Sequence, residues 1–310
     1  SPWGLPPRRS DVERQNPHPV LEQFQNTPVG RAFQRDEVRD KVVPAYMGLI
    51  RQCDDQIGRL FSYLEESGQI GETVIVATSD HGDYLGDHWM GEKDFFHECS
   101  VKIPLIVCDP SSEADATRGT TCDALVEAID LAATFVEMAG GTVPDHIIEG
   151  RSLLPFLRGE TPPEWRDFVV SEYDYSLSPM AVNLGLMPRE CRLFMIADKR
   201  WKFVHSEAPG HRPLLFDMQE DPSEFIDLGD REEHSEIIEL MYERLGRWAR
   251  RMSQRTTRSE EELVNMRGRA RRRGVVFGLY DGSEVEPDIA EHLRNRSTRS
   301  YLDKGEKPGT

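Results

Sequence analysis

The spacing of apolar residues changes along the chain, and each kind of spacing predicts a different element. Between residues 38 and 64 the apolar positions recur at steps of three and four, which is the spacing of one helical face. Pro44 marks the start of this helix or a kink in it, and Gly68 is a natural C-cap. The apolar runs Val74–Ala77 and Ile103–Val107 predict two buried strands.

A further apolar stripe spans Cys122–Ala139 and ends at Gly140-Gly141, which predicts a second helix. The order helix, strand, strand, helix indicates an α/β layer with a mostly parallel sheet. After about residue 165 the apolar runs become short. Asp198-Lys199-Arg200 predicts a tight hairpin, and the apolar spacing over 237–248 predicts an amphipathic helix. These runs predict strands at Phe168–Ser171, Leu193–Ala197, Trp201–His205 and Leu214–Asp217.

The pattern divides the chain into four parts. Residues 1–35, rich in Pro, Arg, Asn and Gln, are expected to form an irregular lead-in. The α/β layer occupies 36–165, and a small α+β unit occupies 166–252. The polar segment 253–310, with a basic cluster at Arg267–Arg273, is expected to form a charged arm.

Composition narrows the classes of partner. The 310 residues carry a net charge of −17, which argues against bulk binding to nucleic acid or to anionic membranes. No apolar run approaches the ~20 residues of a membrane span. The arginine cluster therefore favours an arm between the subunits of a homo-oligomer over a nucleic-acid site. Five cysteines at irregular spacing give no disulfide framework, so a reducing, cytoplasmic compartment is expected.

The run Thr78-Ser79-Asp80-His81-Gly82-Asp83 carries the candidate chemistry, because it follows a predicted strand. Sites in α/β sheets lie beyond the carboxyl ends of strands. Where the strand turns into a loop, Asp80 and His81 can converge on one ion, and Gly82 permits a sharp turn. Carboxylate and imidazole ligands suit Mn²⁺, Zn²⁺ or Ca²⁺. The alternative is a solvated loop in which Asp80 caps a turn.

Lys93 is the candidate contact for an anionic ester, as a point charge on a phosphate or sulfate oxygen. Its alternative is an ordinary surface lysine. His97 and His88 are further ligand or proton-donor candidates, because imidazole titrates near neutral pH. His97 is assigned to substrate binding, and His88 is interpreted as a loop histidine. Glu98 is expected to pair with a cation such as Lys102.

Several segments in one order resemble the C-terminal half of type I sulfatases and phosphonate monoester hydrolases, of the alkaline phosphatase superfamily. The resemblance covers residues 45 to about 250. The segments that carry it include Thr78-Ser79-Asp80-His81-Gly82-Asp83-Tyr84-Leu85-Gly86-Asp87-His88, Lys102-Ile103-Pro104-Leu105-Ile106-Val107, Asp130-Leu131-Ala132-Ala133-Thr134, Gly150-Arg151-Ser152-Leu153-Leu154-Pro155 and Arg200-Trp201-Lys202-Phe203.

The resemblance implies an α/β fold: part of an alkaline-phosphatase-like α/β/α sandwich, at 36–165, plus a small C-terminal antiparallel sheet-and-helix subdomain. It implies that Asp80 and His81 bind one divalent metal ion, Mn or Ca before Zn, and that Lys93 contacts the anion. The partner would be a small anionic ester of sulfate, phosphate or phosphonate. A His rather than Asn after the Asp favours the phosphonate monoester hydrolases.

The chain departs from the family at the nucleophile. The family makes a formylglycine from Cys or Ser in a Cys/Ser-x-Pro-x-Arg motif, and this sequence has none. Cys108-Asp109-Pro110-Ser111-Ser112 comes near, but Ser112 replaces the arginine. The interpretation is a metal-dependent hydrolase without its N-terminal nucleophile region, in which the chain alone is inactive and formylglycine is expected upstream. The alternative is a non-catalytic remnant that acts in assembly or binding.

Overall fold

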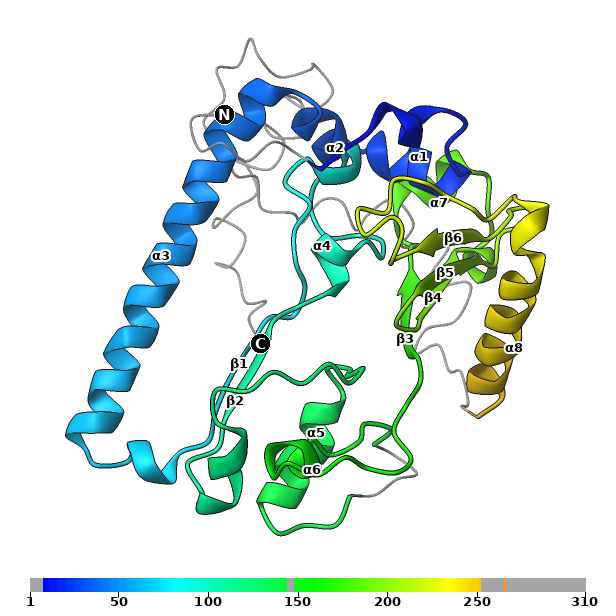
Figure 1. Cartoon of the computed structure of the whole chain (residues 1–310). Helices are drawn as coiled ribbons and strands as arrows, with labels where there is room; N and C mark the ends of the chain where they lie inside the picture. Colours follow the sequence, from blue (N-terminus) through cyan, green and yellow to red (C-terminus); the bar gives the residue numbers. More distant parts are fainter. Residues whose placement is uncertain (1–7, 144–147, 252–264, 266–310) are drawn as a thin grey trace, which may run out of the picture.

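The computed structural model describes residues 8–143, 148–251 and 265. In Figure 1 the long helix α3 (Asp36–Glu66) lies at one side and a small sheet with helix α8 (Ser235–Arg251) at the other. The strands β1 (Ile75–Thr78) and β2 (Leu105–Cys108) run between them. No described helix is long and apolar enough to cross a membrane. The predicted arm at 253–310 lies outside the described residues, apart from residue 265.

The N-terminal segment is folded, which corrects the expectation of an irregular lead-in. It forms η1 (Asp11–Arg14), α1 (Pro19–Gln25) and α2 (Pro28–Phe33). Both α-helices begin with a proline whose fixed φ suits the first turn, and the side chains of His18 and Thr27 cap them. The Pro-rich composition thus marks helix starts, and Val20 and Phe24 of α1 are buried in the main core.

Helix α3 confirms the long apolar stripe, although Pro44 lies inside the helix rather than at its start. The helix ends at Ser67 and Gly68, where Gly68 adopts a φ of +73° that favours glycine. Only its first turns and Leu64 are buried, and every residue from 47 to 63 is exposed.

The strands β1 and β2 are both present but pair antiparallel, so the described part of the α/β layer does not contain the expected parallel pair. Ile75 lies opposite Cys108, and Thr78 lies opposite Leu105. Parallel neighbours need a crossover, usually through a helix. The connection here is a loop with only short helices, η3 (Asp87–Trp89) and α4 (Glu98–Val101), so the chain returns beside the strand it left. The short helix η2 (Ile70–Glu72) precedes β1.

The second predicted helix is shorter than its apolar stripe, because α5 covers only Asp130–Met138. Before it, the backbone carbonyl of Leu125 accepts hydrogen bonds from Trp165 and Arg166, contacts that replace helical ones. The same Arg166 binds both carboxylate oxygens of the fully buried Asp130. The other short helices of this part are η4 (Ser112–Thr117) and α6 (Leu154–Leu157).

The small C-terminal unit matches its prediction. Four strands pair antiparallel in the order β3-β4-β5-β6. Alternate residues of β4 enter two cores: Leu193 and Met195 face the core that contains the loop 84–97, whereas Phe194 and Ile196 face α8. The bounds are β3 (Val169–Asp174), α7 (Pro179–Asn183), η5 (Pro188–Glu190), β4 (Arg192–Ala197), β5 (Trp201–Ser206), β6 (Leu214–Asp217) and η6 (Glu232–His234).

Candidate functional site

A tight turn follows β1 and presents Asp80 and His81. The Ser79 hydroxyl donates to the His81 carbonyl at 2.8 Å, and the His81 N–H donates to Asp80 Oδ1 at 3.0 Å. His81 Nδ1 lies 2.7 Å from the Gly82 carbonyl, and His81 Nε2 lies 3.4 Å from Asp80 Oδ2. A carbonyl only accepts, so Nδ1 carries a proton and donates to the Gly82 carbonyl.

This arrangement is the one that a metal-binding histidine requires. Such a histidine donates its other ring N–H to a carbonyl or carboxylate, which fixes the tautomer. The Asp80 carboxylate is largely in water, and its pKa is lowered first by its own backbone N–H and then by His81. Asp80 is therefore ionised at neutral pH and lies beside the His81 ring, and carboxylate and imidazole both suit a divalent ion.

Ser100 joins this turn to the segment that carries Lys93. Its carbonyl accepts a hydrogen bond from Gly82 N at 2.7 Å, and its hydroxyl donates to the Lys93 carbonyl. Gly82 is needed for close packing, because a Cβ there would collide with the Cys99 carbonyl. The close approach to Cys99 adds a second reason for glycine at this position, beside the predicted turn.

The Lys93 side chain is exposed, and it makes no ion pair within the part of the chain that the structure describes. Burial raises the pKa of Asp83, and the charges of His81 and Lys93 partly offset that rise. Asp83 is thus near enough to both residues to feel their charges. The sequence prediction placed Asp80, His81 and Lys93 in one site; the structure joins their backbones through Gly82 and Ser100, and their common site stays a prediction.

The described residues do not form a complete metal site. Among them there is no group of three or more His, Cys, Asp or Glu side chains that could hold an ion. Asp80 and His81 provide two donors, whereas divalent transition metals and Ca²⁺ take four or more. Further donors would have to come from water, from substrate or from polypeptide beyond this turn.

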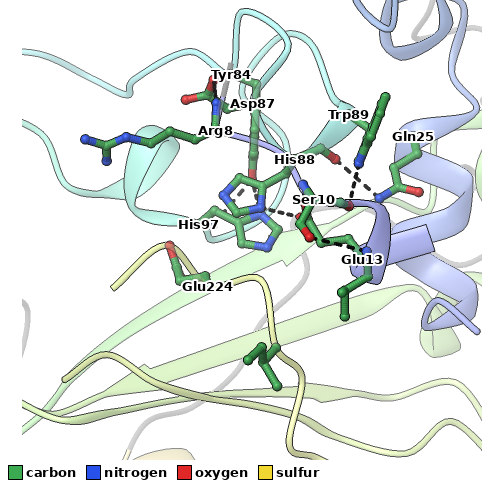
Figure 2. A network of polar contacts seen from close by, with 12 residues as sticks. Arg8, Ser10, Glu13, Gln25, Tyr84, Asp87, His88, Trp89, His97 and Glu224 are labelled. Atoms are coloured by element: carbon green, nitrogen blue, oxygen red, sulfur yellow. Dashed lines mark hydrogen bonds and ion pairs between the residues drawn. The ribbon is translucent and has the colours of Figure 1, made fainter. Parts of the chain in front are cut away.

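His88 and His97 lie together in the core. Their rings stack with 3.8 Å between centroids and 6° between planes. His88 Nδ1 lies 2.6 Å from Glu13 Oε1, and the Tyr84 hydroxyl donates to His97 Nδ1 at 2.9 Å (Figure 2). Burial, together with the charges of His88 and Lys202, holds the pKa of His97 well below its usual value. This burial favours a structural role for His97 over the predicted contact with substrate. His88 lies in the connecting segment, as predicted for a loop histidine, and its ring is buried.

A buried lysine ties the same loop to the small sheet. Lys202 Nζ of β5 lies 2.8 Å from Glu98 Oε1 and 2.7 Å from Glu224 Oε1, and it donates to the Phe96 carbonyl at 3.0 Å. Glu98 also pairs with Lys102 at 3.2 Å, as predicted. Burial raises the pKa of Glu224, which the Lys202 charge partly offsets. A cavity of about 220 Å³, with His97 and Glu224 in its wall, lies beside this cluster.

Sequence reasoning missed Glu13, Lys202 and Glu224. Glu13 lies 75 residues before His88, and Lys202 lies 104 residues after Glu98. No motif spacing joins them, because the pairs form only when the N-terminal helices and the small sheet pack on the loop.

The near-match Cys108 lies at the wrong end of the strand pair. It is opposite Ile75, whereas Asp80 follows Thr78 at the other end. Three strand residues span about 10 Å, so Cys108 lies farther than that from the Asp80 turn. The geometry agrees with the prediction that Cys108 is not the nucleophile of this site.

Comparison with known proteins matches two family profiles. The profile described as "N-sulphoglucosamine sulphohydrolase, C-terminal" matches residues 86–251, more than half of the chain. The profile described as "Sulfatase" matches residues 14–141. Together they cover the strand pair, the Asp80–Lys93 loop and the small sheet.

Individual relatives include a protein of the alkaline phosphatase superfamily and a sulfatase. The chain is 35% identical over 212 residues to the multifunctional alkaline phosphatase superfamily protein PehA of Trinickia caryophylli, covering 67% of this chain and 40% of that protein. It is 32% identical over 204 residues to the N-acetylglucosamine-6-O-sulfatase of Bacteroides thetaiotaomicron, covering 64% and 34%. The chain thus spans about two fifths or less of the length of these relatives.

Among solved structures, the phosphonate monoester hydrolase of Silicibacter pomeroyi superposes with a TM-score of 0.71 at 30% identity. The match covers 81% of this chain and 51% of that chain. The predicted fold class is therefore confirmed, and the matched part is about half of that larger protein.

Proposed function

Because the chain belongs to the sulfatase family of the alkaline phosphatase superfamily, we propose that it contributes to metal-dependent hydrolysis of a sulfate, phosphate or phosphonate ester. The observation that carries this proposal is the loop after β1. The two candidate metal donors, Asp80 and His81, directly precede Gly82, whose N–H binds the Ser100 carbonyl, and the Ser100 hydroxyl binds the backbone carbonyl of the exposed Lys93.

Asp80 and His81 would hold the metal, with the His81 tautomer set by the Gly82 carbonyl. A bound divalent ion supplies Lewis acidity at an ester oxygen and lowers the pKa of a coordinated hydroxyl. The Lys93 ammonium would stabilise the charge that grows on the non-bridging oxygens of the transferring group. Esters of phosphorus are favoured as substrates, since the similar Silicibacter structure is a phosphonate monoester hydrolase and His81 follows the aspartate.

Formylglycine, the nucleophile expected for the family, does not fit the described residues. Cys108 is the near match to the acceptor motif, and it lies at the far end of the β1–β2 pair from Asp80. No step is therefore assigned to a nucleophile of this chain. This separation also supports the second candidate function, a chain that binds metal or a partner without hydrolysis of its own.

A metal titration with matched variants tests the proposed ligands. We expect the chain to bind Mn²⁺, followed by electron paramagnetic resonance of the free ion, and Asp80→Ala to weaken binding at least about tenfold, which is ~1.4 kcal/mol. Asp109→Ala, at a half-buried carboxylate just beyond β2 that accepts a hydrogen bond from Ser111 N, serves as the control and should leave binding unchanged. Equal affinities for both variants would remove Asp80 from the site.

Hydrolysis of p-nitrophenyl esters of sulfate, phosphate and phenylphosphonate tests the reaction. In the assembly that turns over, Lys93→Ala should lower kcat roughly 10²-fold or more and leave Mn²⁺ affinity unchanged. Lys102→Ala is the matched control, because Lys102 is also exposed but pairs with Glu98. Metal binding without turnover of any ester would favour the second candidate function.

A further inference from the structure

The loop that carries Lys93 contains several non-glycine residues in the left-handed backbone conformation. With φ between +47° and +90°, they are Leu85, His88, Trp89, Glu92 and Phe95. Large side chains rarely adopt a positive φ, and such residues persist only where their surroundings hold them in place. Two of them, Glu92 and Phe95, lie on either side of Lys93 in the sequence. Contacts from other segments must therefore stabilise the conformation of this loop.

The segment before α1 binds the tip of the loop, where His88 and Trp89 lie (Figure 2). The His88 N–H donates to the Arg8 carbonyl at 2.8 Å. The Trp89 indole N–H donates to the Ser10 carbonyl at 2.8 Å. His88 Nδ1 lies 2.6 Å from Glu13 Oε1, and these two side chains are 5% and 9% exposed. Both left-handed residues at the tip are thus held by one short segment.

Helix α1 contacts the same loop at two further places. The Gln25 side-chain amide donates to the His88 carbonyl at 3.3 Å. The Phe24 ring packs against the Phe95 ring with 5.8 Å between centroids, and both side chains are 3% exposed. The N-terminal residues therefore contact the loop both at its tip and just after Lys93.

The loop passes this restraint to Lys93 through its backbone. The Tyr84 N–H donates to the Glu92 carbonyl at 2.9 Å, which closes the loop directly before Lys93. The Ser100 hydroxyl donates to the Lys93 carbonyl. The Lys93 side chain itself is exposed, so the direction in which it leaves the chain is set by the backbone on either side.

We propose that residues 8–14, the N-terminal strap, position Lys93 for the transferring group, with Glu13 as a positioning residue that acts through His88. The strap fixes the left-handed tip, and the closed loop then fixes the backbone at Lys93. Misplacement of a catalytic group by about 1 Å can cost ~10²-fold in rate, so this restraint matters for turnover. The proposal rests on the proposed function, because Lys93 needs positioning only if it contacts an anion.

Hydrogen exchange of the full chain, followed by peptide mass spectrometry, tests the strap without any substrate. Glu13→Ala removes the carboxylate that binds His88 and also accepts from the Ser10 N–H at 2.7 Å. We expect the amides of residues 84–93 to exchange at least about tenfold faster in this variant. Asp11→Ala, at an exposed carboxylate of the same short helix, is the matched control and should leave this exchange unchanged.

Urea unfolding checks that each variant remains folded. Trp89→Phe provides a milder break, because it keeps an aromatic ring and removes only the indole N–H that binds the Ser10 carbonyl. This variant should accelerate exchange in the same peptides, so the test remains decisive if Glu13→Ala does not fold. Unchanged exchange of residues 84–93 in the folded variants would overturn the proposal.

A double-mutant cycle with Lys93→Ala connects the strap to the reaction. In the assembly that turns over p-nitrophenyl esters, Glu13→Ala should lower kcat about tenfold and leave KM and Mn²⁺ affinity nearly unchanged. In the Lys93→Ala background it should have no further effect, because the group that it positions is absent. Equal losses of kcat with and without Lys93 would also overturn the proposal. If the parent assembly turns over no ester, the proposed reaction fails, whereas the exchange rates still decide whether the strap holds the loop.

Discussion

Substitution of Lys202 tests whether the small sheet stabilises the loop between β1 and β2. Its ammonium is 3% exposed and contacts two carboxylates, Glu98 at 2.8 Å and Glu224 at 2.7 Å. The Glu98 backbone N–H also donates to Glu224 at 2.7 Å, so the cluster fixes the start of α4. We predict that Lys202→Met, which keeps the length and removes the charge, destabilises the protein and loosens this loop.

The magnitude follows from the charge that is left behind. Removal of one partner from a buried ion pair costs about 3–5 kcal/mol, because the remaining carboxylate is desolvated without compensation. Glu224 is 2% exposed, so this range applies to it, whereas Glu98 is 30% exposed and keeps Lys102 nearby. Domains are stable by only about 5–15 kcal/mol, so the loss should be plain in urea unfolding followed by tryptophan fluorescence.

The cost should also depend on pH. Burial already raises the pKa of Glu224. Without Lys202 that pKa rises further above the unfolded value, so the folded variant takes up a proton as the pH falls and regains stability. Relative to wild type, the defect should therefore shrink from pH 8 to pH 5, by at most ~1.4 kcal/mol per unit. The double variant Lys202→Met/Glu224→Gln should recover part of the loss at pH 8.

Lys199→Met, at the exposed tip of the adjacent hairpin, is the matched control and should change stability by less than about 0.5 kcal/mol. The reasoning would be refuted if Lys202→Met lost no more than this control. A defect that is equal at pH 5 and pH 8, or that Glu224→Gln does not relieve, would show that the loss comes from packing and not from the orphaned carboxylate.

Three further predictions concern other parts of the structure. Burial lowers the pKa of His18 to about 4, so as the pH falls His18 is protonated in the unfolded state before it is protonated in the folded state. The free energy of unfolding should therefore fall between pH 6.5 and pH 4, by up to ~1.4 kcal/mol per pH unit. His18→Gln should reduce this pH dependence, measured by acid unfolding. Gly82→Ala should cost about 1–3 kcal/mol in thermal unfolding and weaken Mn²⁺ binding, because its Cβ meets the Cys99 carbonyl. Cys108→Ser should leave ester hydrolysis by the active assembly unchanged, since Cys108 pairs with Ile75 at the far end of the strands.

The spacing of apolar residues was enough to predict the elements whose formation depends mainly on their own sequence. Helix α3 and the four strands of the small sheet follow from residue spacing, which needs no knowledge of partners. The antiparallel direction of β2 relative to β1 could not be predicted from the spacing, because two apolar runs can pair in parallel or antiparallel. The segment that connects the two strands determines which pairing forms. The helices α1 and α2 were not predicted, because their prolines and polar residues were interpreted as an irregular segment. In the structure these residues cap and begin two short helices.

The candidate site divides in the same way. Asp80 and His81 are adjacent, and Lys93 lies in the same loop, so a motif was enough to propose them together. Glu13 and Lys202 support that loop from distant segments and offer no signal in spacing. The prediction for His97 had only its residue type behind it, and packing placed the ring in the core against His88.

One side of the Asp80 turn is already fixed, because the Gly82 N–H and the Lys93 carbonyl both bind Ser100. A metal ion held by Asp80 and His81 would therefore lose little binding free energy in ordering this part of the loop. Because an ion that binds only the folded chain stabilises it by mass action, Mn²⁺ should raise the temperature of thermal unfolding. Asp80→Ala should remove that gain and leave the metal-free stability nearly unchanged, since Asp80 is largely exposed.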